Sequence, residues 1–184
     1  MQSPQFAPHF CRGFIPIAFV FSAPGRHEAH EKKPVAGETG VNLASALEHL
    51  HNIKPCVFSS TNRYDYRITN AFDTPIAVSL GHRASEATNA QILAPANVQR
   101  VLSDLAGSDL VVLCGLKAQL LSAHVSDAGF IAFHASHTGN QALNRKYKIS
   151  SDTALASPKS RRNQRAVLWA TDLIALLDQH NSAR

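Results

Sequence analysis

Residues Ile15 to Gly40 join an apolar run to a loop punctuated by glycine, in the sequence I-P-I-A-F-V-F-S-A-P-G-R-H-E-A-H-E-K-K-P-V-A-G-E-T-G. The apolar run, Ile15–Phe21, is rich in β-branched and aromatic residues, which predicts a strand buried on both faces. From Val41 onward leucines recur with helical spacing, and Thr39 is placed to cap that helix. The loop from Ala23 to Gly40 is therefore predicted to connect a strand to a helix.

Further along the chain, apolar runs alternate with amphipathic segments. Strands are predicted at Tyr66–Phe72, Asp109–Gly115 and Gly129–His134. Helices are predicted around Val98–Leu105, at Leu116–Ser122 and at Val167–Leu177. We expect irregular structure in the first dozen residues, in the polar stretch Ser79–Ala94 and in the basic segment that continues to about Arg161.

This alternation predicts an α/β fold. Strands connected through helices run parallel, so we expect three layers, α/β/α, with a central, mostly parallel, four-stranded sheet. The length of 184 residues and the hydrophobic fraction of 45% suit one core. A single domain over residues 1–184 is therefore expected.

The charge of the chain is unevenly distributed. Basic residues outnumber acidic residues 18 to 13, which gives a formal net charge of +5. The excess is concentrated from Arg145 to Arg165, where Asp152 is the single acid. This concentration favours a polyanionic partner, and a solvated surface segment is the alternative.

The cysteines and the hydropathy exclude several classes of protein. Cys11, Cys56 and Cys114 are far apart and odd in number, and they match no zinc or iron–sulfur spacing. We therefore expect buried free thiols in a reducing compartment, and neither a metal nor another cofactor. No apolar run approaches the roughly 18 residues that a membrane-spanning helix needs, so a cytoplasmic protein is expected.

In parallel sheets the reactive loops follow the carboxyl ends of the strands. Four segments are therefore expected at one edge of the sheet: the loop after Phe21, Asn70, Gly115, and His134 with the residues behind it. Glycines allow a loop backbone to approach a ligand closely. Their spacing matches neither the phosphate-binding loop that ends in Gly-Lys-Ser/Thr nor the G-x-G-x-x-G of dinucleotide folds, which disfavours nucleotide binding of those kinds.

Three blocks of sequence lie at this expected edge. They are A-P-G-R-H-E at Ala23–Glu28, P-V-A-G-E-T-G at Pro34–Gly40 and H-A-S at His134–Ser136. Together they resemble the uracil-DNA glycosylase superfamily. The first two look like its first active-site motif, which one branch writes G-E-A-P-G-x-x-E and P-F-V-G-x-A-G-x-x-L, and the third looks like its second motif, commonly H-P-S. Asn70, which ends I-T-N, stands where the family carries an asparagine that hydrogen-bonds the extruded base.

The resemblance implies a monomeric, cofactor-free DNA glycosylase that hydrolyses the N-glycosidic bond of uracil or another deaminated base in DNA. His134 would donate a hydrogen bond to the departing base, and Asn70 would read the pyrimidine edge. The residues implied to hold the base are Ser22, Ala23, Pro24, Gly25, Gly37 and Ser136. Those implied to hold DNA phosphates are Arg145, Lys146, Lys148, Arg161 and Arg162. The target nucleotide must be flipped out or already single-stranded, because its reacting atom is inaccessible inside a duplex.

The sequence departs from the family pattern at several positions. Ala23 replaces the aspartate that activates water in the best-known branch, and Val35 replaces an aromatic residue. The cysteines cannot supply the four ligands of the iron–sulfur cluster that is usual in the branch with the most similar first motif. Two alternatives therefore stay open: a catalytically inactive member of the fold that binds nucleic acid, and a hydrolase of free nucleosides or nucleotides. Taken singly, His134 also fits a core histidine, and Asn70 fits a turn cap.

Overall fold

Four parallel strands form the centre of the sheet in this computed structural model, which describes residues 6–82, 86–149 and 157–183. The strands are β3 (Ile15–Phe21), β4 (Tyr66–Asn70), β5 (Leu110–Cys114) and β6 (Ile131–Ala135), in the order β4-β3-β5-β6. Each predicted strand is thereby confirmed, with ends that differ by at most two residues. Because all four run parallel, their carboxyl ends meet at one edge of the sheet.

The prediction of four strands is wrong, because the described residues form a six-stranded sheet. The two further strands are β1 (Phe6–Ala7) and β2 (Phe10–Cys11). They form an antiparallel pair, and β2 also pairs antiparallel with β4, so the sheet is mixed rather than all parallel. Each of these strands has two residues, which is too short for an alternating pattern to show in the sequence.

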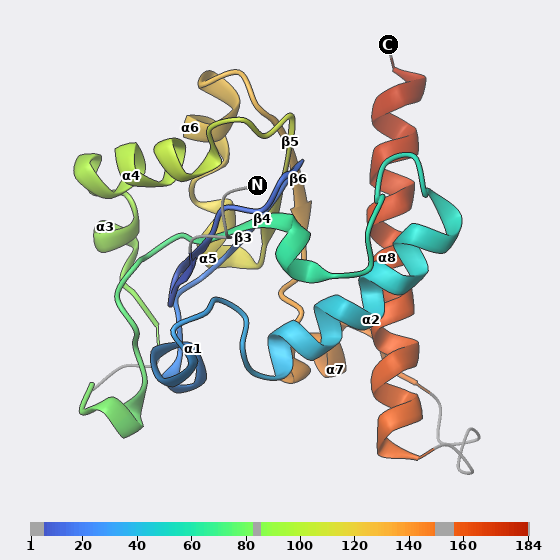
Figure 1. Ribbon diagram of the computed structural model, residues 1–184, viewed down its shortest axis with the longest axis horizontal. Helices are drawn as coiled ribbons and strands as arrows, with labels where there is room; N and C mark the ends of the chain where they lie inside the picture. The colour runs from blue at the N-terminus through green and yellow to red at the C-terminus, as the bar shows by residue number, and fades with distance from the viewer. Residues whose placement is uncertain (1–5, 83–85, 150–156, 184) are drawn as a thin grey trace.

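Helices cover both faces of the sheet (Figure 1). One face packs against α2 (Glu38–Ile53) and α8 (Pro158–Ser182), and α7 (Asn140–Lys146) contacts both of these helices. The other face packs against α4 (Pro95–Leu105) and the short helices α3 (Asn89–Ile92), α5 (Leu116–Gln119) and α6 (Ser122–Asp127). Successive residues of β3 alternate between the two cores: Phe19 and Phe21 face α2 and α8, and Ala18 and Val20 face α4. The three predicted layers are therefore present.

Several short elements lie in segments that were predicted to be irregular. The Ala23–Gly40 loop contains α1 (Arg26–Glu31), and the polar stretch after β4 contains the 3-10 turn η2 (Val78–Leu80) and α3. A second 3-10 turn, η1 (Arg63–Asp65), precedes β4. The basic segment contains α7 and the first turn of α8, whose start carries a readable signal: Ser157 caps the helix and Pro158 follows at its first position.

The cysteines and the hydropathy of the helices bear on two further expectations. Cys11 and Cys114 are buried free thiols as predicted, whereas Cys56 is exposed, which corrects the expectation that all three are buried. Within the described ranges, no helix combines the length and the apolar character needed to cross a membrane.

Candidate functional site

A cleft of about 910 Å³ lies at the carboxyl edge of the parallel strands. Ser22 enters it from the end of β3, Gly115 from the end of β5, and Ser136 and His137 from the end of β6. The α7 helix closes one side with Arg145 and Lys146, and His134 lies at the wall. Three of the four segments predicted to converge therefore share this cleft, although they are separated by up to 115 residues in the sequence (Ser22 to His137).

The loop of the first motif, Ala23–Gly40, is held in place by the carboxylate of Glu28. The Oε2 atom of Glu28 accepts a hydrogen bond from the backbone N–H of Gly25 at 3.0 Å, and its Oε1 atom accepts one from Gly37 at 3.2 Å. These two glycines precede α1 and α2, so Glu28 joins the starts of both helices. The loop behind β3 is held as well, because the carbonyls of Ser22 and Pro24 accept backbone hydrogen bonds from Phe72 and Ile76 at 2.9 and 2.8 Å. Ala23, between them, is half-buried.

The same loop contains a residue in an unfavourable backbone conformation. Val35 has a φ of 45°, in the left-handed region that β-branched residues rarely adopt, and its side chain is buried. Its carbonyl group lies against Gly40 in the first turn of α2, where a Cβ atom would overlap the carbonyl oxygen and lie 2.8 Å from the carbonyl carbon. Gly40 is thus required by close backbone contact rather than by its own dihedral angles.

A buried asparagine links the two motif loops. Asn42, on α2, donates from Nδ2 to the Thr138 carbonyl at 2.7 Å and to Oδ1 of Asn140 at 2.9 Å. The Thr138 hydroxyl donates in return to the Thr39 carbonyl at 3.1 Å. In Figure 1, α1, the first turn of α2 and α7 accordingly gather at the same side of the sheet. The structure therefore fixes the relative position of the two predicted motifs by hydrogen bonds.

Asn70 lies at the carboxyl end of β4, in register with Phe21 of β3. The residue is 3% exposed, and its Oδ1 atom has no hydrogen-bond partner among the described residues. Its carbonyl accepts a hydrogen bond from Arg100 at 2.8 Å, which holds the strand end in place. Asn70 is not among the residues that line the cleft, so the structure brings it to the predicted edge but encloses its side chain. An unpaired amide oxygen in a buried position is uncommon and calls for a partner.

His134 lies in β6, as predicted, and the strand ends one residue later, at Ala135. Strand alternation places its side chain on the α6 face, where Nε2 lies 2.7 Å from the Ser122 hydroxyl. The side chain is exposed, which argues against the alternative of a core histidine. Ser136 is half-buried in the loop, and its carbonyl accepts a hydrogen bond from the indole N–H of the buried Trp169 at 2.7 Å.

His137 is a residue of the cleft that the sequence reasoning did not select. Its Nδ1 atom accepts a hydrogen bond from the Gly139 backbone N–H at 2.9 Å, and its ring meets the Phe21 ring edge-on, with centroids 5.5 Å apart. Burial lowers the pKa of His137 below the ordinary 6.5, and the nearby carboxylates of Glu86 and Glu28 oppose that shift only in part. The signal that would have identified it is a second histidine within the H-A-S-H-T-G block, two residues before a glycine.

The predicted phosphate-binding residues fall into two groups. Arg145, Lys146 and Lys148 are exposed on or just after α7, and Lys146 pairs with Asp172 at 2.7 Å. Arg161 and Arg162 lie in the first turns of α8, and Arg162 reaches Glu38 of α2 at 2.9 Å. Glu38 also accepts from Asn140, a residue of the cleft, so Arg162 is brought towards the cleft.

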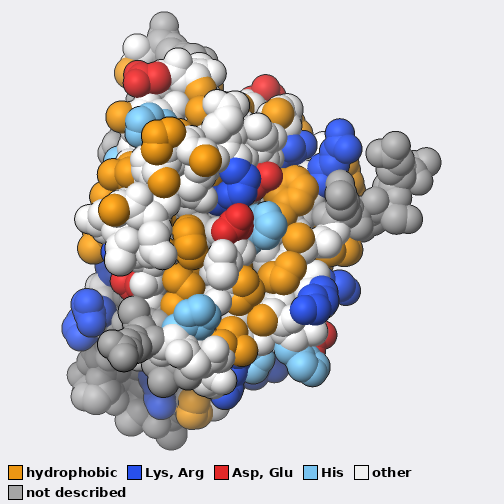
Figure 2. Space-filling model, turned by 90° about the vertical axis from the view of Figure 1, so that its left-hand side faces the viewer, with side chains coloured by type: hydrophobic (Ala, Val, Ile, Leu, Met, Phe, Trp, Pro, Cys, Tyr) orange, Lys and Arg blue, Asp and Glu red, His pale blue; other side chains and the backbone are white. Residues whose placement is uncertain are grey.

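One further basic residue of the cleft was missed by the sequence reasoning. Lys117, on α5, lines the cleft and donates to Asn89 Oδ1 at 2.9 Å. Figure 2 views the side that carries α3 and α4, where the visible Lys and Arg side chains stand apart among apolar ones. The basic residues at the cleft come instead from α5 and α7.

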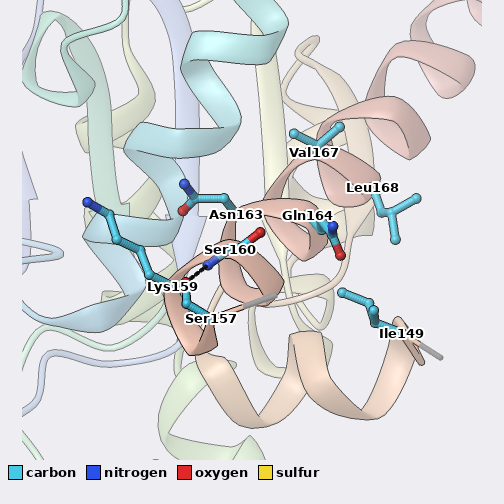
Figure 3. A pocket seen from close by; sticks show the side chains of 8 residues that line it. All are labelled: Ile149, Ser157, Lys159, Ser160, Asn163, Gln164, Val167 and Leu168. Carbon is cyan, nitrogen blue, oxygen red and sulfur yellow. Dashed lines mark hydrogen bonds between the residues drawn. The ribbon is translucent and has the colours of Figure 1, made fainter. Parts of the chain in front are cut away.

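A second hollow, of about 680 Å³, lies between Ile149 and the first turns of α8 (Figure 3). Its walls are Ile149 on one side and α8 residues from Ser157 to Leu168 on the other. Residues 150–156, which connect these walls, lie outside the described residues, so the hollow supports no assignment. Within the described ranges, no three His, Cys, Asp or Glu side chains are grouped to hold a metal ion.

No family model matches the chain, and no curated protein matches it.

Proposed function

We propose that the protein is a DNA glycosylase of uracil-DNA glycosylase type, which removes uracil or another deaminated base from DNA by hydrolysis. The observation that carries the proposal is the convergence of Ser22, from the first motif, with Ser136 and His137, from the second, around one cleft. The parallel strands bring these segments to one edge, and the hydrogen bonds of Asn42 and Thr138 then hold the two motifs together beside the cleft.

The chemistry requires two kinds of group, and the carboxyl edge offers both. When the N-glycosidic bond breaks, its electron pair leaves with the base and positive charge develops on the sugar. Water then adds at the sugar carbon and loses a proton, and the base anion takes one up. An imidazole N–H close to the departing base stabilises the negative charge as it develops. The segment from His134 to His137 supplies two candidate imidazoles.

The base itself needs a group that both donates and accepts hydrogen bonds. A carboxamide does this, and Asn70 holds one at the end of β4 with its oxygen unpaired among the described residues. Because that side chain is enclosed, a base reaches it only if the residues around it move. A flipped nucleotide would thus pair with a group that the free protein leaves unsatisfied.

The charge around the cleft suits DNA better than a free nucleoside. Lys117, Arg145 and Lys146 line the cleft, against the single acid Glu86 among its described lining residues. Several phosphates flank a flipped nucleotide in DNA, and their contacts with basic side chains supply sequence-independent affinity.

A binding protein without catalytic activity is the second candidate, and Ala23 is the observation that favours it. This position lies next to Ser22 of the cleft. It carries a methyl group, whereas the best-known branch of the uracil-DNA glycosylase superfamily carries a water-activating carboxylate here. The two candidates differ in whether the bond is broken, not in where the base binds.

Single-stranded and duplex oligonucleotides that contain uracil, hypoxanthine or xanthine separate these candidates. The protein is incubated with each, and abasic sites are cleaved with alkali. The proposal predicts strand cleavage at the modified position with at least one substrate, and a loss of that cleavage in Asn70→Leu, which keeps the size of the side chain but removes its polar atoms. Binding with no cleavage of any substrate would refute the enzyme and support the binding protein.

A further inference from the structure

The geometry points to His137, rather than His134, as the imidazole that donates to the departing base. This inference rests on the proposed function and deepens it, because the motif resemblance places the donor at His134. The two residues are three positions apart, but the structure gives them different surroundings.

The hydrogen bond to Gly139 fixes which nitrogen of His137 carries the proton. A backbone N–H can only donate, so Nδ1 of His137 must be the unprotonated, accepting nitrogen. In the neutral ring the proton then resides on Nε2. No described residue forms a hydrogen bond with Nε2, so the N–H at this position remains available to a ligand in the cleft.

Two glycines make room for this ring. A Cβ atom on Gly115 would lie 3.0 Å from the Cβ of His137, and one on Gly139 would lie 2.9 Å from its Nδ1. Gly115 also has a φ of 94°, which side chains rarely tolerate. The Phe21 ring packs edge-on against the imidazole from β3. The ring is thus held in one orientation by contacts from β3 and from the loops behind β5 and β6.

His134 lacks these features. Its Nε2 atom is already engaged with the Ser122 hydroxyl, in an exposed position on the face of the sheet that carries α6. Solvent at such a position weakens any charge–dipole interaction with a departing base. A donor is effective where it is shielded from solvent and the ring does not have to reorient; His137 is half-buried and held in place, whereas His134 is exposed.

Two substitutions separate the function of the Nε2–H group of His137 from that of Nδ1, which holds the loop by accepting a hydrogen bond from Gly139. His137→Asn keeps an amide oxygen close to the place of Nδ1, where it can accept from Gly139, but does not reach the place of Nε2. His137→Gln places an amide N–H near Nε2 and gives up the acceptor at Nδ1. If His137 donates to the base, His137→Asn lowers the single-turnover excision rate by about 10²- to 10³-fold, and His137→Gln retains at least roughly tenfold more activity than His137→Asn. A role in loop structure alone predicts the reverse order.

The experiment compares these variants with His134→Gln and with the control His124→Gln, an exposed residue of α6 outside the cleft. We expect the His137→Asn loss to exceed the His134→Gln loss by at least roughly tenfold, and the control to match the wild type within about twofold. A larger loss in His134→Gln, or a rate of His137→Asn equal to or above that of His137→Gln, overturns the assignment while the glycosylase proposal stands. Absence of excision by the wild type contradicts the glycosylase proposal itself.

A spectroscopic measurement decides the donor assignment independently of turnover. In ¹⁵N-labelled protein at neutral pH, the His137 ring should give one protonated nitrogen, Nε2, and one unprotonated nitrogen, Nδ1. Addition of free uracil as the probe should shift the Nε2 resonance of His137 more than either ring nitrogen of His134. A proton on Nδ1, or a shift confined to His134, overturns the inference whether or not the enzyme turns over.

Discussion

Gly40→Ala is predicted to destabilise the fold severely, because it forces apart the turn that joins the first motif to α2. The added Cβ would overlap the Val35 carbonyl oxygen and lie 2.8 Å from the carbonyl carbon, whereas ordinary contact begins at 3.4 Å. The carbon must therefore move by about 0.6 Å (3.4 − 2.8), and the oxygen must move further.

The surroundings of Val35 prevent an inexpensive adjustment. Its φ of 45° is already unfavourable, and its side chain is 3% exposed, so a movement of its backbone also withdraws apolar surface from the core. Overpacking typically costs about 1–3 kcal/mol, and partial loss of a buried valine adds about 1 kcal/mol or more. We expect a loss of roughly 3 kcal/mol, which in a chain of this length lowers Tm by about 6–12 °C.

The assay is urea denaturation followed by circular dichroism, with Gly25→Ala as the matched control in the same loop. Gly25 has a φ of −100°, and an added Cβ meets only the end of the Glu28 side chain, at 3.2 Å, and no backbone atom. The control should lose less than about 1 kcal/mol. Equal stability of the two variants would refute the proposed backbone contact between Val35 and α2.

Three further predictions concern the cleft. Asn42→Asp puts a carboxylate in place of a buried donor that faces two acceptor oxygens, the Thr138 carbonyl and Oδ1 of Asn140, and should cost about 3 kcal/mol in urea denaturation; a loss below about 1 kcal/mol would contradict the link between the motifs. The pKa of His137 is lowered by burial, even with Glu28 and Glu86 nearby, so the unfolded chain takes up a proton before the folded one as pH falls below 6.5. The free energy of unfolding should then decrease with falling pH from about 6.5, by at most about 1.4 kcal/mol per pH unit from this group, and His137→Asn should flatten that decrease; identical slopes in the two proteins would contradict the buried neutral ring. Arg145→Gln should weaken binding to single-stranded DNA and reduce the slope of log affinity against log salt by about 0.7, as measured by fluorescence anisotropy, and an unchanged slope would remove Arg145 from the phosphate contacts.

The central strands were predictable because each is a continuous apolar run, a pattern that depends only on local sequence. The β1–β2 hairpin was not, since it owes its existence to pairing with β4, more than 55 residues away from Phe10 (Phe10 to Thr69). Short elements such as α1 and α7 likewise carry no measurable periodicity of their own.

The sequence selected His134 as the donor, whereas the structure favours His137, because the orientation of a side chain depends on contacts that a local sequence pattern does not contain. The sequence predicted the strand Gly129–His134, which placed His134 at the carboxyl edge of the sheet but not on a particular face. In the structure the strand extends to Ala135, and the alternation of strand side chains directs His134 to the face that carries α6. The orientation of His137 depends on Gly115 and Gly139, and only the first of these was identified from the sequence.

Polar contacts within the site were also beyond local sequence patterns. The link from Asn42 to Thr138 spans 96 residues, and nothing in a helical repeat distinguishes a buried asparagine from an exposed one. Conversely, the arrival of Ser22, Gly115 and the second motif at one edge followed directly from the parallel order of the strands.

Product analysis in ¹⁸O-labelled water tests the central claim most directly. A uracil-containing single-stranded oligonucleotide is incubated with the wild-type protein, and the free base and the abasic strand are analysed by mass spectrometry. Hydrolysis at the N-glycosidic bond predicts unlabelled free base and one ¹⁸O atom on the sugar of the abasic site, which is reduced with borohydride at once to prevent exchange. No release of base from this strand, or from strands that contain hypoxanthine or xanthine, would contradict the claim that the cleft breaks this bond.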